Sequence, residues 1–230
     1  MEPTVIYEDN HIIGVNKPPG WLVQADKTGD STLADWTKSY IKLRYKKPGD
    51  VFLGVIHRID RPVSGVVVFA RTTKALTRMN ELIRDRDMNK HYWAIIGSRP
   101  NPFSADLTHY LIKDREKNIT KAYDQLSRRA EGAKKSEMSY NMIGELGDHY
   151  LLEIDLKTGR SHQIRAQLAK VGYPIRGDVK YGYKSPNEDA SIHLHCRSMS
   201  FIHPVKKEPV VITADPPDEQ IWRLFEDMWL

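Results

Sequence analysis

A charged segment between two apolar runs places the strongest constraint on how this chain can fold. The runs, Val51–Ile56 and Val66–Ala70, have the length and β-branched content of short buried strands. The charged segment, His57–Gly65, must then lie on the connection between them. A proline in it removes a backbone donor and Gly65 permits unusual backbone conformations, so the connection should be a defined turn. Such a turn can aim its carboxylate, Asp60, for chemistry, or it can be an ordinary turn with a surface ion pair, which contributes about 0–1 kcal/mol.

Composition bounds the class of protein. The chain has 230 residues and 40% hydrophobic content, enough for one large domain or two small lobes of a globular protein. Its 35 basic residues exceed its 30 acidic ones, which favours a polyanionic partner, although many basic proteins bind no nucleic acid. The single cysteine excludes an intramolecular disulfide and favours a reducing compartment, and we find neither a secretory signal nor an apolar run of about 18 residues. We therefore expect a cytoplasmic protein with no membrane association.

Hydrophobic periodicity predicts a mixed α+β fold in one domain over residues 1–230. Thr32 can cap a helix whose inward face carries Leu33, Trp36, Tyr40 and Leu43. The remaining expected elements are an N-terminal hairpin, a helix over 73–84, a strand over 91–96, short strands within 104–135, a hairpin of 139–143 with 150–156, a helix over 161–170, two strands around 192–202 and a final helix with Ile221, Trp222, Phe225 and Met228.

A second dense cluster occurs at Thr158–Arg165, with the sequence Thr-Gly-Arg-Ser-His-Gln-Ile-Arg. A glycine turn followed by a helix start and several cations favours an anion such as phosphate or carboxylate. A capped helix with a solvated basic first turn explains the same residues equally well. A Lys-x-Tyr pair, Lys90 and Tyr92, lies at the start of an expected strand, where the tyrosine can pack in the core or present its ring to a base.

These motifs resemble those of the RluA family of RNA pseudouridine synthases. His57–Gly65 is similar to the family's His-Arg-Leu-Asp-x-x-Thr-Ser-Gly signature, with isoleucine and valine at the two departing positions, and Thr158–Arg165 matches every specified residue of Thr-Gly-Arg-x-His-Gln-Ile-Arg. The likeness extends from about residue 5 to about 215, and Arg61-Pro62 is most similar to short, TruC-like members without an N-terminal RNA-binding module. The resemblance implies one pseudouridine-synthase-like catalytic domain with a mainly antiparallel mixed sheet, flanking helices and a cleft across the sheet.

The resemblance also implies the reaction and its residues. The chain would isomerise uridine to pseudouridine in structured RNA, with tRNA favoured and rRNA close behind, without cofactor or metal and as a monomer with no obligate protein partner. Asp60 would be the catalytic carboxylate, paired with Arg165, and Tyr92 would stack on the flipped uracil. Residues expected to contact the RNA are His57, Arg58, Arg61, Lys17, Lys90, Arg160, His162 and Ile164.

Other functions fit the sequence less well. A catalytically silent RNA-binding or assembly factor with the same fold remains the main alternative, although the three implied catalytic residues are present. A hydrolase using Asp60 with a second acid such as Asp178 would need two acids in dense motifs. A zinc site at His193, His195, Cys196 and His203 is disfavoured because Cys196 would point away from the strand face that carries His193 and His195. No glycine-rich phosphate loop accompanies the kinase-like His-Arg before Asp60.

Overall fold

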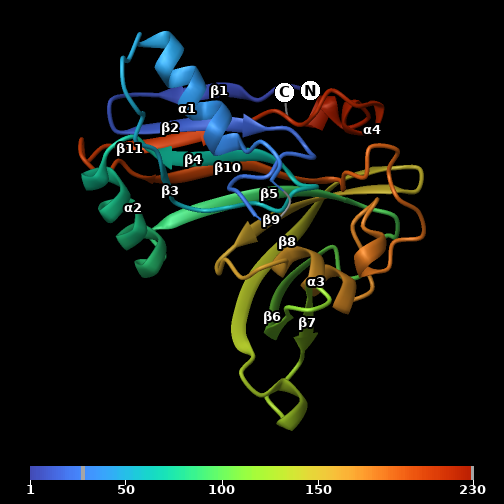
Figure 1. The fold of residues 1–230 in the computed structure, drawn as a ribbon. Helices are drawn as coiled ribbons and strands as arrows, with labels where there is room; N and C mark the ends of the chain where they lie inside the picture. The colour runs from blue at the N-terminus through green and yellow to red at the C-terminus, as the bar shows by residue number, and fades with distance from the viewer. Residues whose placement is uncertain (27–28, 229–230) are drawn as a thin grey trace. The chain divides into compact units, whose positions relative to one another are not determined.

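The computed structural model describes residues 1–26 and 29–228. The chain divides into two compact units. The first unit comprises Met1–Asn89 and Cys196–Pro217, and the second comprises Lys90–His195 and Asp218–Leu230. Both combine helices with antiparallel strand pairs, which confirms the α+β class (Figure 1). The expectation of one domain over the whole chain stays a prediction.

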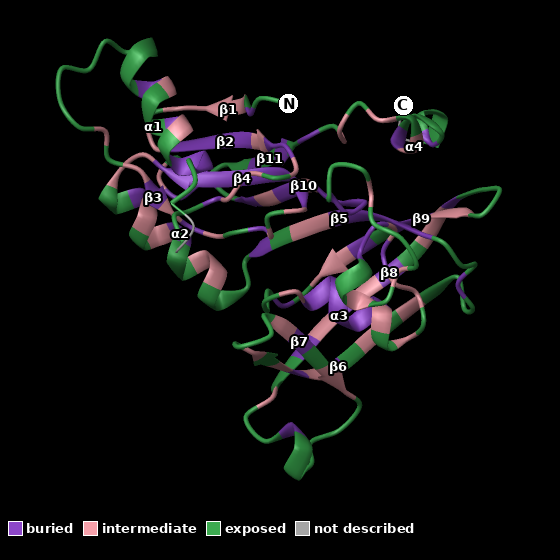
Figure 2. Ribbon diagram, turned by 45° about the vertical axis from the view of Figure 1, so that its right-hand side comes forward, coloured by how far each residue is buried: buried purple, intermediate pink, exposed green. Residues whose placement is uncertain are grey.

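The sheet of the first unit has the strand order β1-β2-β4-β10, with β3 paired to β4 and β11 paired to β10. The pairs β1–β2, β2–β4, β3–β4 and β10–β11 are antiparallel. Every residue of β4 is buried, as its continuous apolar run predicts (Figure 2). The strands are β1 (Thr4–Glu8), β2 (Ile12–Lys17), β3 (Gly54–Val55), β4 (Ser64–Ala70), β10 (Leu194–Ile202, mostly in this unit) and β11 (Pro209–Thr213).

Two helices belong to the first unit, α1 (Leu33–Arg44) and α2 (Thr73–Asp85). The predicted cap of α1 is confirmed, because the Thr32 hydroxyl accepts from the Asp35 N–H in a capping box. Of the four residues predicted on the inward face of α1, only Leu33 is buried. The helix buries Leu33, Ala34, Thr37 and Ile41, whereas Leu43 is 79% exposed.

The face of α1 that carries Trp36 and Tyr40 does not point into the core, because these two rings make other contacts. Trp36 and Tyr40 are only partly buried and stack on each other, and the Tyr40 hydroxyl donates to Glu8 at the end of β1. The Trp36 and Tyr40 rings therefore cover the edge of the first unit and do not enter its core. Helix α2 packs against β3 and β4 and buries Ala75 and Met79.

The sheet of the second unit has the order β5-β9-β8-β6-β7, and all of these neighbours pair antiparallel. Helix α3 (Gln163–Lys170) contacts β6 and β7. The strands are β5 (Met88–Ile96, mostly in this unit), β6 (Ser104–Asp114), β7 (Ile119–Tyr123), β8 (Lys134–Leu146) and β9 (His149–Leu156). Short 3-10 helices cover Arg128–Ala130, Val179–Tyr181 and Glu226–Met228.

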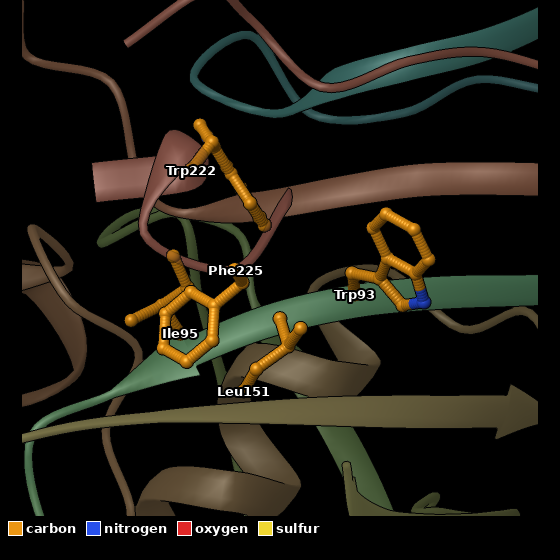
Figure 3. Close-up of a cluster of buried hydrophobic side chains, with 5 residues drawn as sticks. All are labelled: Trp93, Ile95, Leu151, Trp222 and Phe225. Atoms are coloured by element: carbon orange, nitrogen blue, oxygen red, sulfur yellow. The ribbon is translucent and has the colours of Figure 1, made fainter. Parts of the chain in front are cut away.

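A cluster of buried hydrophobic side chains forms part of the core of the second unit (Figure 3). Trp93 and Ile95 of β5 and Leu151 of β9 pack with Trp222 and Phe225 from the C-terminal segment. Helix α4 (Gln220–Arg223) presents Trp222 to this cluster. The C-terminal apolar residues thus belong to the core of the second unit.

Three expected elements differ from the structure. The apolar run 51–56 contributes only the two-residue strand β3, which pairs with the end of β4 at Phe69 and Ala70. The two strands expected around 192–202 are one strand, β10, and the expected final helix is the short α4 followed by a 3-10 turn. Among the described residues, no helix combines the length and apolar character needed to cross a membrane.

Candidate active site

Asp60 lies on a tight turn in the first unit, between β3 and β4, as predicted. Its carbonyl oxygen accepts from the Val63 N–H at 3.0 Å. Ile59 and Val63 are 8% and 2% exposed, so buried side chains anchor the turn on both sides of the aspartate. Gly65 has φ +113°, and a Cβ there would lie 2.3 Å from the main-chain oxygen of Cys196. Only glycine fits where β4 begins, and the half-buried carboxylate is held on a rigid support.

Lys17 holds this turn from inside the unit. Its side chain is fully buried, and Nζ donates to the carbonyl oxygens of Pro18, Trp21 and Arg61 at 2.9–3.1 Å. Burial lowers the pKa of Lys17 to about 7; the nearby Asp60 opposes this shift and Arg61 adds to it. The Lys17 ammonium thus fastens the Lys17–Trp21 segment to the Asp60 turn, and its contact with RNA stays a prediction.

The other polar residues of the His57–Gly65 segment differ in exposure. His57 is half-buried, and its Nε2 accepts from the Val68 N–H at 3.0 Å, so the ring supports β4. Arg61 is exposed and donates through Nε to the Gly20 carbonyl and through Nη1 to Asp30 at 2.8 Å. Arg58 is exposed. Of these three side chains, the two arginines are accessible to a ligand.

Arg165 lies in the second unit, where α3 holds it in a buried clamp. Its side chain is 6% exposed, and Nε and Nη2 donate to the two carboxylate oxygens of Asp178 at 2.7 and 2.8 Å. The guanidinium carbon lies 4.9 Å from the centre of the Tyr181 ring. The paired donors and the ring fix the plane of the guanidinium. Sequence analysis considered Asp178 only as the second acid of a rival hydrolase; its pairing with Arg165 was missed.

The other residues at the start of α3 mostly build this clamp. Gln163 accepts from the Thr158 hydroxyl and the Arg160 N–H through Oε1, which ties the preceding turn to the helix. His162 Nδ1 is 2.8 Å from the Tyr181 hydroxyl, which also accepts from the Thr120 N–H. Burial raises the pKa of Tyr181. The motif therefore serves mainly to place Arg165, whereas Arg160 stays exposed.

Tyr92 and Lys90 lie on β5 of the same unit. Tyr92 is 7% exposed and opposite Ile154 of β9. Lys90 is half-buried, and its Nζ lies beside Gly159, where a Cβ would be 3.7 Å away. Lys90 of the Lys-x-Tyr motif thus lies beside the Thr158–Arg160 turn. Ile164 is 5% exposed and packs inside the unit, and its contact with RNA stays a prediction.

The histidines considered for zinc have other neighbours. His193 Nε2 is 3.2 Å from a Glu219 oxygen, and His203 Nε2 is 2.9 Å from Asp9. Over residues 1–26 and 29–228, no three or more His, Cys, Asp or Glu side chains gather in a way that could hold a metal ion. His203 Nδ1 accepts from the N–H groups of Val205 and Lys206, which assigns it to the β10–β11 connection.

Comparison with known proteins adds to this geometry. The family model described as RNA pseudouridylate synthase matches residues 11–170, a span that contains Asp60, Tyr92 and Arg165. The chain is 29% identical over 220 residues to ribosomal large subunit pseudouridine synthase C of Buchnera aphidicola, covering 91% of this chain and 66% of the relative. It is 30% identical over 234 residues to the protein of that name from Salmonella typhi, covering 98% of this chain and 70% of the relative. The chain thus spans about two thirds of these relatives' length.

A solved structure supports the fold. Human RNA Pseudouridylate Synthase Domain Containing 4 superposes with a TM-score of 0.77 at 22% sequence identity, covering 96% of this chain and 91% of that chain. The motifs around Asp60 and Arg165, the family model and the fold agree with one another. The chain belongs to the RluA family of RNA pseudouridine synthases, a group of isomerases.

Proposed function

We propose that this chain converts uridine to pseudouridine in large-subunit ribosomal RNA. The observation that carries the proposal is the family match over residues 11–170, which includes all three implied catalytic residues. The substrate follows the names of the relatives, which are synthases of the ribosomal large subunit. The preference for tRNA that the sequence suggested stays a prediction and is tested by the same experiment.

Asp60 is the reactive group in this proposal. The reaction breaks the bond from ribose to ring nitrogen 1 of uridine and joins the ribose to carbon 5, with no redox change. A carboxylate on a stiff turn suits this task, because small displacements of a catalytic group are costly to the rate. We infer that Arg165 pairs with Asp60 in the active site, while Asp178 holds the Nε and Nη2 edge of the guanidinium.

The substrate base must leave its stack before the carboxylate reaches it, at a cost of a few kcal/mol. In our proposal the Tyr92 ring stacks on the extruded uracil, and the exposed Arg58, Arg61 and Arg160 contact backbone phosphates. These contacts position the RNA without reading its sequence. Affinity should then fall steeply as salt rises.

Mapping of pseudouridine in cells tests activity and target together. Total RNA from a strain without the gene is compared with RNA from strains carrying the wild type or Asp60→Asn. We expect one or more large-subunit rRNA sites to lose pseudouridine on deletion and to regain it only with the wild type. Loss at tRNA sites alone would replace the rRNA assignment by tRNA. Restoration by Asp60→Asn would support the silent RNA-binding factor and refute the catalytic role.

A further inference from the structure

The second unit contains a pocket that no predicted site residue lines. It has a volume of about 310 Å³ and lies between the end of β5, the β8–β9 turn, the segment 176–184 and the C-terminal helix. Its polar wall carries His149, Arg176, Tyr183 and Lys184, with the exposed Asp148 at the turn. Gly97 and three further residues complete the lining. We call it the Arg176 pocket.

The main chain of Arg176 is fixed on both sides. Its N–H donates to the Ile95 carbonyl at 2.8 Å, and its carbonyl accepts from the His193 N–H at 3.0 Å. His149 begins β9 and pairs with Leu146 across a two-residue turn, where Gly147 has φ +55°. The two side chains therefore start from rigid positions, which is what a preorganised binding site requires.

Each of these two side chains has a buried nitrogen without a partner. Arg176 Nε and His149 Nδ1 are shielded from solvent, and neither makes a hydrogen bond to any residue in the described part of the chain. An arginine Nε–H can only donate, and leaving a buried donor unpaired is unfavourable. A ligand oxygen that accepts hydrogen bonds would satisfy it.

The charge around the pocket indicates an anionic ligand. Arg176 and Lys184 are cationic, and the acid on the lining, Asp148, is exposed. Burial lowers the pKa of His149, the neighbouring Arg176 and His193 lower it further, and Asp148 opposes them. An anion placed between His149 and Arg176 would relieve this repulsion and provide the missing acceptors.

We propose that the Arg176 pocket binds one backbone phosphate of the RNA substrate. The proposal rests on the proposed function for the presence of RNA. One segment links the pocket to Arg165, because Asp178 holds that guanidinium with its carboxylate and accepts the Tyr183 N–H with its carbonyl at 3.0 Å. A phosphate held here would fix the register of the strand relative to the Arg165 clamp.

The first test measures RNA affinity against salt for the wild type, Arg176→Met and Arg176→Lys. The probe is an rRNA or tRNA transcript that the wild type modifies, or a large-subunit rRNA transcript if it modifies none. Losing one phosphate contact should reduce the slope of log affinity against log salt by about 0.7–0.9. Between 50 and 200 mM salt, the wild type should then lose about threefold more affinity than Arg176→Met. Arg176→Lys should keep most of the slope. Arg84→Met is the matched control, since Arg84 is exposed and paired with Asp85.

The second test titrates inorganic phosphate while NMR follows the His149 imidazole. We expect phosphate to raise the pKa of His149 in the wild type and to have little effect in Arg176→Met. Unchanged salt slopes together with an unshifted His149 would overturn the proposal. A shifted His149 with an unchanged slope would assign the pocket to a free anion and overturn the RNA assignment.

The outcomes also separate this proposal from the proposed function. If the wild type converts no RNA while both tests behave as expected, the synthase activity fails and the phosphate pocket stands. If conversion is normal and both tests fail, the pocket assignment alone is lost. Thermal unfolding of each variant verifies that a lost effect does not reflect a lost fold.

Discussion

Replacing Lys17 by methionine should separate the stability of the fold from the placement of Asp60. The site lowers the pKa of Lys17 from 10.5 to about 7, which corresponds to about 5 kcal/mol by which it disfavours the charged form. Methionine removes that cost but leaves the carbonyls of Pro18, Trp21 and Arg61 without their donor, at about 1–3 kcal/mol each. The two effects are similar in size, so the free energy of unfolding should change by no more than about 4 kcal/mol.

Activity should respond far more strongly than stability. The Arg61 carbonyl that Lys17 holds belongs to the residue after Asp60, so losing the bond frees the turn at the carboxylate. A displacement of about 1 Å at a catalytic group can cost about 100-fold in rate. We expect kcat for pseudouridine formation to fall at least that far in single-turnover assays, with RNA affinity nearly unchanged. Denaturant unfolding measures the stability of the same sample.

A lysine on α2 provides the control for this experiment. Lys74 is exposed, so Lys74→Met removes one charge from the same unit without touching the turn. We expect it to retain wild-type kcat. A folded Lys17→Met protein with near-normal kcat would refute the role of Lys17 in positioning Asp60.

Three further predictions concern stability and the clamp. An unfolded lysine keeps its proton up to about pH 10.5, whereas folded Lys17 loses its proton near pH 7. The unfolding free energy of the wild type relative to Lys17→Met should therefore rise by roughly 2–3 kcal/mol between pH 7 and 9. A difference between the two proteins that is the same at both pH values would contradict this prediction. Asp178→Asn removes the carboxylate that pairs with the buried Arg165 and should destabilise the protein by about 3–5 kcal/mol and lower kcat. Calorimetry and turnover assays measure the two effects, and unchanged values of both would refute the clamp. Gly65→Ala should lower the melting temperature more than Gly20→Ala, because both glycines have positive φ but only Gly65 abuts the main chain of β10; equal shifts would remove the steric argument.

Local patterns in the sequence predicted most of the secondary structure. The alternation over 150–156 identified strand β9, and the apolar run 66–70 identified the buried strand β4. Thr32 marked the start of α1 through its capping chemistry. These features depend on residues within a few positions of one another, so a linear pattern contains the information.

Other features depend on distant segments and escaped prediction. Tyr40 of α1 is only partly buried, and its hydroxyl donates to Glu8 of β1, a residue 32 positions earlier in the chain. Lys17 resembles a surface cation in a polar, proline-rich stretch, yet three carbonyl groups from two segments enclose it. Asp178 follows a glycine in a loop without periodicity, so nothing local indicates that it holds Arg165.

The sequence by itself determined the family, the α+β class and the turn that carries Asp60, because motif identity, hydrophobic period and turn chemistry are all local properties. Only the tertiary structure decided what the charged side chains do. A cation has the same appearance in a sequence whether it is exposed, as Arg58 is, or fully buried, as Lys17 is. Its role follows from the acceptors that folding brings around it, since burial is unfavourable for a charge unless partners compensate it.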